Sequence, residues 1–96
     1  MFNNLKSLTL LYLDKNKISF INQKAFENLI NLEFFNLNEN KLQFIKQYYF
    51  KSLEKLKNLN LSVNQISFIE PNSFADQINL EKLYLRNNAL KMLKYK

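Results

Sequence analysis

The sequence predicts a solenoid, a stack of coils in which each coil has one short strand, a sharp turn and a return segment. The first observation is the pattern L-x-x-L-x-L-x-x-N-x-L, which occurs four times at a constant interval of 24 residues, beginning at Leu8, Leu32, Leu56 and Leu80. The second is the alternation of apolar residues at the centre of each copy, which is typical of a strand with one buried face. The third is that no helical stripe of useful length separates the copies. We therefore expect extended or single-turn return segments.

The four coils span residues 2–25, 26–49, 50–73 and 74–96, and together they form one domain over residues 1–96. The first strand must be short because four polar residues, 14–17, follow Leu13 at once. The second coil has Phe35 where the others have leucine, so its core must widen or a neighbour must yield. The third coil carries the only proline, Pro71, in a return segment that needs no backbone donor there.

The fourth coil departs from the others at one core position. Gln77 stands where the first three coils have Leu5, Leu29 and Leu53. We expect the neighbouring Ile78 to turn inward and cover this polar side chain.

Stacking would make residues 24 apart into neighbours, about 4.8 Å apart where strands pair. Charges then fall into columns of alternating sign, namely Glu33–Lys57–Glu81, Lys46–Glu70–Lys94 and Glu27–Lys51. Exposed ion pairs contribute only about 0.2 to 1 kcal/mol each. These columns therefore select the register of stacking more than they stabilise it.

Composition excludes several classes of site. The chain has no cysteine and no histidine, so thiolate zinc sites, disulfides and histidine bases are impossible. The carboxylates of Asp14, Glu33 and Glu39 are predicted to lie near one another, but no nucleophile or base accompanies them. We expect no enzyme activity, no catalytic residue, no cofactor and no metal. No run of about 18 apolar residues spans a membrane in this stretch, and no leader is recognisable at residues 1–10. We expect a fragment of a longer array.

The net charge of +6 invites an electrostatic function. Thirteen lysines, one arginine, sixteen asparagines and no glycine are also the usage of an AT-rich coding sequence. We favour this second interpretation, because phosphate recognition prefers the forked guanidinium of arginine and only Arg86 supplies one.

The four copies of the pattern, with Phe35 as an apolar replacement, resemble a leucine-rich repeat protein over essentially the whole chain. The 24-residue interval and the recurring Phe26, Phe50 and Phe74 resemble the "typical" subclass, common in extracellular receptors and adhesion proteins. The resemblance implies an α/β-class leucine-rich repeat solenoid, a right-handed horseshoe. Short parallel strands would line its concave face, irregular or single-turn return segments its convex face, and little true helix would form. The chain departs from that subclass in having no glycine and no cysteine-rich cap.

The resemblance also implies that the asparagine of each copy bonds the backbone of adjacent coils after each strand. A tight interior bend separates donors and acceptors from water, and an asparagine side chain offers both. This structural asparagine ladder would consist of Asn16, Asn40, Asn64 and Asn88.

Residues between the patterned leucines should point away from the core and are the candidates for partner binding. One end of this face is apolar and aromatic, its middle is rich in amides, and its other end is cationic and aromatic. Exposed aromatics and arginine are enriched at binding hot spots. The candidates are Leu10, Tyr12, Asp14, Phe34, Asn36, Asn38, Asn58, Asn60, Ser62, Lys82, Tyr84 and Arg86.

Two further motifs carry less weight. Phe20, Phe44, Phe68 and Met92 form a column that predicts either a lateral binding stripe or, as we favour, a packed cluster on the return side. Residues 60–62 match a glycosylation sequon, which is expected by chance with so many asparagines. Whether Asn60 is glycosylated stays open.

Three functional hypotheses follow. The first is a non-enzymatic recognition module that binds a protein partner through the concave strand face of a receptor ectodomain, extracellular and membrane-anchored at the cell surface. The second is an intracellular leucine-rich repeat scaffold or adaptor in the cytoplasm, which the lack of cysteine favours. The third is electrostatic binding of an anionic partner by lysines, although the columns mix lysines with glutamates and predict no specific nucleic acid. End-to-end self-association through uncapped repeats is a further expectation, because Leu5, Leu8, Met92 and Leu93 lack a covering coil.

Overall fold

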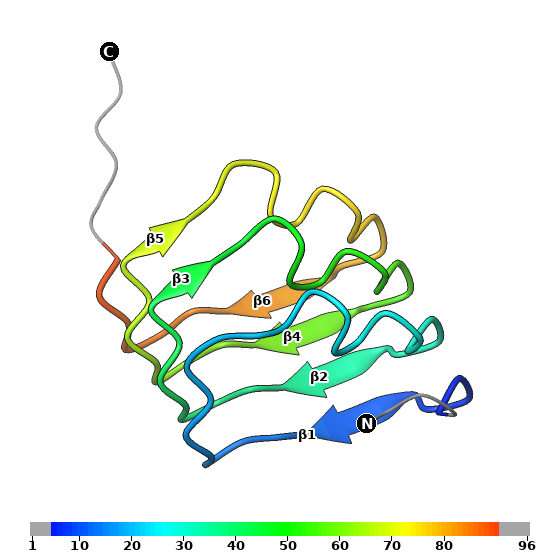
Figure 1. Cartoon of the computed structure of the whole chain (residues 1–96), viewed down its shortest axis with the longest axis horizontal. Helices are drawn as coiled ribbons and strands as arrows, with labels where there is room; N and C mark the ends of the chain where they lie inside the picture. Colours follow the sequence, from blue (N-terminus) through cyan, green and yellow to red (C-terminus); the bar gives the residue numbers. More distant parts are fainter. Residues whose placement is uncertain (1–4, 91–96) are drawn as a thin grey trace.

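The computed structural model describes residues 5–90, which form two parallel sheets joined by turns, with no helix in that range. Four three-residue strands make the larger sheet and two shorter strands make the smaller one (Figure 1). The larger sheet contains β1 (Leu10–Tyr12), β2 (Phe34–Asn36), β4 (Asn58–Asn60) and β6 (Lys82–Tyr84). The smaller sheet contains β3 (Phe44–Ile45) and β5 (Phe68–Ile69).

The register of the larger sheet follows the repeat interval of the sequence. Strands pair in the order β1-β2-β4-β6, and Leu11, Phe35, Leu59 and Leu83 are aligned as successive partners. Beyond each strand the pairing continues, as where the Leu37 N–H donates to the Asn60 carbonyl at 2.8 Å. The predicted solenoid of short parallel strands and irregular return segments is therefore confirmed.

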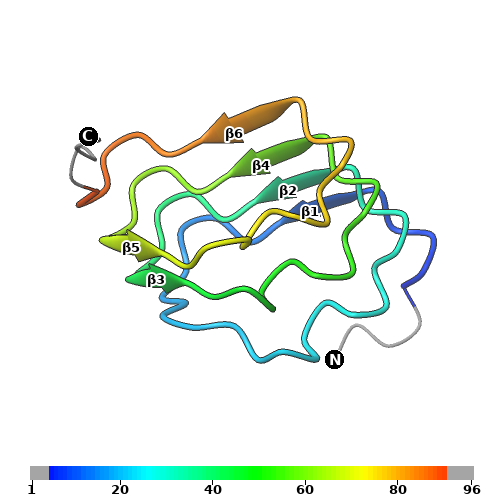
Figure 2. The same cartoon turned by 90° about the horizontal axis from the view of Figure 1, so that it is seen from above.

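The core lies between the two sheets, which occupy opposite sides of the coils (Figure 2). The patterned leucines of the two middle coils are fully buried, whereas Leu5, Leu83 and Leu90 near the ends of the stack are about two-fifths exposed. This gradient is expected where each coil buries its apolar edge against its neighbours. The predicted end residues Met92 and Leu93, and Lys94 of the charge column, lie outside the described residues.

Phe35 fits the core through aromatic packing. Its ring makes edge contacts with Phe26, at 4.9 Å between centroids, and with Phe50, at 6.2 Å. Phe50 in turn stacks on Phe74 at 6.0 Å. Two of the recurring phenylalanines thus pack against the larger side chain, and Phe35 is fully buried.

The aromatic residues of the return side correct one expectation. Phe20, Phe44 and Phe68 are 68%, 45% and 51% exposed, so the packed cluster that we favoured for this column is not formed. Met92 of the same column lies outside the described residues. Tyr49 is buried, and burial raises the pKa of its hydroxyl, while the adjacent Tyr48 is partly exposed.

The fourth coil also corrects an expectation. Ile78 is 78% exposed and does not cover Gln77. Gln77 itself fills the leucine position, where its Nε2 donates to the carbonyls of Phe50, at 2.6 Å, and Leu53, at 3.3 Å. A buried polar side chain is tolerated there because part of its hydrogen-bonding capacity is satisfied by the preceding coil.

Two of the predicted charge pairs are present. The Lys57 Nζ lies 3.8 Å from the Glu33 Oε1, and the Lys46 Nζ lies 3.7 Å from the Glu70 Oε2. Within residues 5–90, no ion pair joins Lys57 to Glu81 or Glu27 to Lys51. All four paired side chains are substantially exposed, so the pairs contribute little to stability.

The asparagines of the pattern join neighbouring coils. The Oδ1 atom of Asn64 accepts from the Leu42 N–H at 3.0 Å, and its Nδ2 donates to the Leu37 and Leu61 carbonyls, both at 3.1 Å. Asn40 and Asn88 make the same contacts one coil earlier and later. Asn16 differs, because among residues 5–90 its amide donates only to the Leu13 and Asp14 carbonyls of its own turn.

The residue before each ladder asparagine has a left-handed backbone. Lys15, Glu39, Val63 and Asn87 have φ values between 55° and 58°. Asparagine adopts this region readily, whereas a β-branched residue is a genuine outlier there. Val63 is therefore strained by the turn geometry that all four coils share.

Removing a ladder side chain should destabilise the fold in proportion to its contacts between coils. We expect Asn64→Ala to lower the free energy of unfolding by about 1 to 3 kcal/mol, because a buried donor and a buried acceptor lose their partner. Asn16→Ala is the matched control and should change it by less than about 0.5 kcal/mol. Urea denaturation measures both, and equal losses would contradict this role.

Gln77→Leu should raise the free energy of unfolding by about 1 kcal/mol, because it removes a buried Oε1 atom that has no hydrogen-bond partner. The Phe50 and Leu53 carbonyls keep their backbone donors, Leu53 N–H and Leu56 N–H. Gln77→Ala should lower stability by leaving a cavity. Thermal unfolding measures both variants. A lower melting temperature for Gln77→Leu would show that the hydrogen bonds of the glutamine stabilise the fold by more than its unpaired Oε1 destabilises it.

Val63→Asn should raise the free energy of unfolding by about 1 kcal/mol by relieving the left-handed strain. The reverse exchange, Asn87→Val, should lower it by a similar amount at the equivalent position. Differential scanning calorimetry measures the stability of the two variants. A Val63→Asn chain that is less stable than wild type would contradict the proposal that Val63 is strained.

Candidate binding face

The predicted partner-binding residues share the outer side of the larger sheet and the turns that follow its strands, here called the strand face. Leu10, Tyr12, Lys82, Tyr84 and Arg86 are exposed. The remaining predicted residues between them are partly buried, except Ser62, which is 9% exposed. The strand face consists of Leu10, Tyr12, Asp14, Phe34, Asn36, Asn38, Asn58, Asn60, Ser62, Lys82, Tyr84 and Arg86.

The apolar end of the strand face is a contact between two aromatic rings on β1 and β2. Tyr12 lies against Phe34 with 5.3 Å between ring centroids and a tilt of 49°. Leu10 and Tyr12 are 54% and 58% exposed. Rings held by their neighbours lose little conformational freedom on binding, so this end is suited to contact an apolar group of a partner.

The amide-rich middle of the strand face is ordered by local hydrogen bonds. The Asn36 Oδ1 accepts from the Asn38 N–H at 2.9 Å, and the Asn60 Oδ1 accepts from the Ser62 N–H at 3.0 Å. These bonds use the amide oxygens where the chain leaves β2 and β4. The amide nitrogens, which can only donate, remain available for a ligand.

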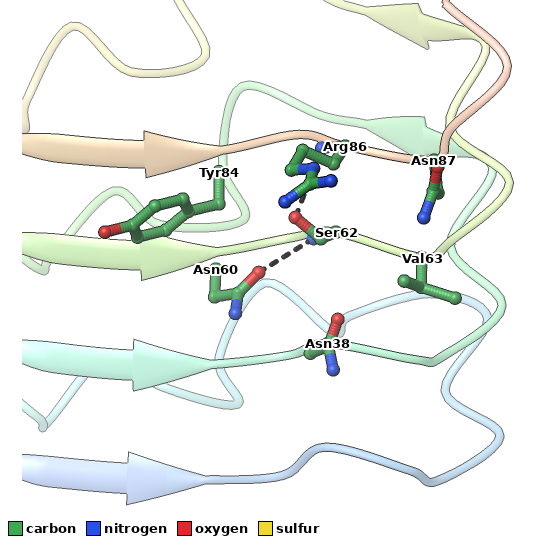
Figure 3. A pocket seen from close by; sticks show the side chains of 7 residues that line it. All are labelled: Asn38, Asn60, Ser62, Val63, Tyr84, Arg86 and Asn87. Carbon is green, nitrogen blue, oxygen red and sulfur yellow. Dashed lines mark hydrogen bonds between the residues drawn. The ribbon is translucent and has the colours of Figure 1, made fainter.

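A hollow of about 370 Å³ lies where the chain leaves β2, β4 and β6 (Figure 3). The Ser62 Oγ accepts from the Arg86 N–H at 3.1 Å and so links the two later turns across the hollow. We call this feature the turn hollow. It is lined by Asn38, Asn60, Ser62, Val63, Tyr84, Arg86 and Asn87.

Sequence reasoning found five of these lining residues and missed Val63 and Asn87. Both follow the residues that were selected as outward-facing, at the position before the ladder asparagine. A signal was present, because valine replaces the polar residues Lys15, Glu39 and Asn87 of the other coils. Only the left-handed turn reveals that this position borders the strand face.

A second hollow, of about 520 Å³, lies at the edge of the first coil rather than on the strand face. Its lining is mainly apolar and includes Leu13, Ile18, Phe20, Ile21 and Phe26. The equivalents of Leu13 and Ile18 are buried in the middle coils, so the hollow is the uncovered side of a coil and not a separate site.

The part of the chain that the structure describes offers no metal centre, because no group of three or more acidic side chains gathers there. Over the same residues, no helix has the length and apolar character to cross a bilayer.

Comparisons with known proteins agree with this geometry. A family model described as leucine rich repeat matches residues 1–42 and 30–90. A comparison with curated proteins finds no match.

Solved structures resemble the chain closely in fold. A structure of a TLR13–ssRNA13 complex has 35% identity and a TM-score of 0.91 over 96% of this chain. A glycosylated Toll–Spatzle complex from Drosophila has 26% identity and a TM-score of 0.89 over 93%. The leucine-rich repeat domain of APL1B has 26% identity and a TM-score of 0.90 over 96%.

The chain spans only 13%, 12% and 27% of the length of these three structures. The family model nevertheless covers nearly all of the chain, and the parallel strands and asparagine bonds follow the same repeat. The chain therefore belongs to the leucine-rich repeat family.

Proposed function

We propose that this chain is a non-enzymatic recognition module that binds a protein partner through the strand face. The observation that carries this proposal is the continuity of the face, from the Tyr12–Phe34 contact at one end to the turn hollow at the other. Aromatic residues and arginine dominate the energetics of protein interfaces. The ladder asparagines hold the face on a rigid scaffold, which limits the entropy lost on binding.

The structural relatives support a recognition function. Toll is found in complex with Spatzle, and TLR13 in complex with ssRNA13. We propose an extracellular or cell-surface location, as the resemblance to the typical leucine-rich repeat subclass implies, with a cytoplasmic scaffold as the alternative.

The size of the strand face limits its affinity. Four coils spaced by about 4.8 Å, each contributing about five residues from its three-residue strand and the turn that follows, present an area of about 300 Å². A stable interface uses about 800 Å² of each partner. We therefore expect weak binding by this stretch alone, with additional coils supplying the rest of the interface in the parent protein.

The second candidate function is binding of an anionic polymer, which is suggested by the similarity to TLR13 in its complex with ssRNA13. On the strand face only Lys82 and Arg86 are cationic, which is a small number for a track of phosphates. A steep loss of binding with salt would distinguish this candidate from a protein partner.

The proposal predicts a specific loss of affinity when the aromatic end is removed. Peptides selected on the wild-type chain from a random display library serve as the probe, and fluorescence anisotropy measures their Kd. We expect the double variant Tyr12→Ala, Phe34→Ala to raise Kd at least about tenfold, because hot-spot aromatics contribute more than about 1 kcal/mol each.

Phe44→Ala with Phe68→Ala is the matched control, since these exposed aromatics lie on the smaller sheet. Its Kd should stay within about twofold of wild type, a difference below about 0.5 kcal/mol. Peptides that lose affinity only in this control would place binding on the return side and refute the proposal. Sedimentation velocity on each variant separates end-to-end association from peptide binding.

A further inference from the structure

We propose that the turn hollow is a subsite for a carboxylate, namely an aspartate or glutamate side chain of the protein partner, with Arg86 as its counter-ion. This inference rests on the proposed function, because the partner residue must approach from the strand face. It assigns a chemical class to one end of that face.

The hydrogen bonds inside the hollow use acceptor atoms and leave side-chain donors unoccupied. The Asn60 Oδ1 is occupied by the Ser62 N–H at 3.0 Å, so the two hydrogens of its Nδ2 remain for a ligand. The Ser62 Oγ accepts from the Arg86 N–H at 3.1 Å, and its own hydroxyl hydrogen remains free to donate. These internal bonds also orient both side chains before a ligand arrives, as their placement in Figure 3 shows.

The charge of the hollow is uncompensated. No aspartate or glutamate lines it, and among residues 5–90 no carboxylate forms an ion pair with Arg86. A guanidinium presents parallel N–H groups that match the two oxygens of a carboxylate. One carboxylate would therefore satisfy the charge of Arg86 and accept from the neighbouring amide and hydroxyl.

Val63 forms an apolar wall beside these polar groups. It keeps a left-handed backbone with φ 55°, although the other coils have polar residues there. Strain of this kind persists where surrounding structure enforces it, and it is often found at binding sites. Val63 is 39% exposed, and its methyl groups can cover the methylene groups of an acidic side chain. Shielding from water strengthens the ion pair that the carboxylate would make.

The same groups fit a carboxylate better than a nucleic acid backbone. Apart from Arg86, the lining side chains are neutral, so the hollow carries a single positive charge. A chain of phosphates would need several cations along its path, but Lys82 is the only other cation on the strand face. A single acidic residue on a protein loop is the ligand that these groups match.

The test is a titration of the ¹⁵N-labelled chain with N-acetyl-glutamate methylamide, with the glutamine analogue as the uncharged control probe. We expect saturable shifts of the Arg86 Nε–H and Asn60 Nδ2 signals with the glutamate probe only. Arg86→Gln should weaken the binding at least about tenfold, since it removes the charge and the fork. Lys24→Gln removes an exposed charge outside the strand face and should leave the binding unchanged.

Three outcomes would overturn the inference: equal shifts with the glutamine probe, binding that survives in Arg86→Gln, or inorganic phosphate that saturates the same signals at lower concentration than the glutamate probe. Amide spectra of each variant verify that its fold is retained.

The display peptides separate failure of this inference from failure of the proposed function. Suppose that the aromatic double variant abolishes peptide binding while the glutamate probe gives no shift. The carboxylate subsite is then overturned and the strand face remains the recognition surface. If the probe binds but peptides respond only to the return-side control, the role of the hollow in protein recognition is overturned.

Discussion

The structure depends on one constraint, the need to satisfy backbone groups where the chain bends inside the stack. Each turn after a strand buries N–H and carbonyl groups that water cannot reach. Asn40, Asn64 and Asn88 each accept from an N–H of the preceding coil and donate both to a carbonyl of that coil and to carbonyls of their own turn, so one side chain closes a turn and joins two coils. Strand pairing and leucine packing rely on this alignment, because the ladder maintains the stacking register at the edge of the core.

This constraint divides the residues between scaffold and surface. The leucines and asparagines of the pattern are occupied by packing and by hydrogen bonds, and they are buried in the middle coils. The alternate residues of each strand are free to differ, and they change from aromatic on β1 and β2 to amide on β4 and cationic on β6. Chemical variety on a regular backbone is what a recognition surface requires.

The turns connect the scaffold to the proposed site. The left-handed residue that each turn needs lies next to the ladder asparagine, so the geometry that seals the core also sets the border of the turn hollow. At this position the third coil carries Val63, which its backbone disfavours. The strain is local, and the bonds of Asn64 hold the turn in place around it. The residue that stabilises the turn, Asn64, and the residue that borders the proposed site, Val63, are therefore adjacent in the sequence.

The sequence by itself determined the period, the position of the four strands of the larger sheet, their parallel register and the leucine core. These features repeat every 24 residues, and a repeated pattern has only one stacking that buries all of its apolar positions. Tertiary structure alone decided the exceptions. Gln77 turned inward because the preceding coil offers it carbonyls, while Ile78 stayed in solvent, and Phe44 and Phe68 remained exposed on a two-stranded sheet. Val63 and Asn87 joined the turn hollow because side chains from three successive turns meet there, a distance relation that spacing along one chain does not contain.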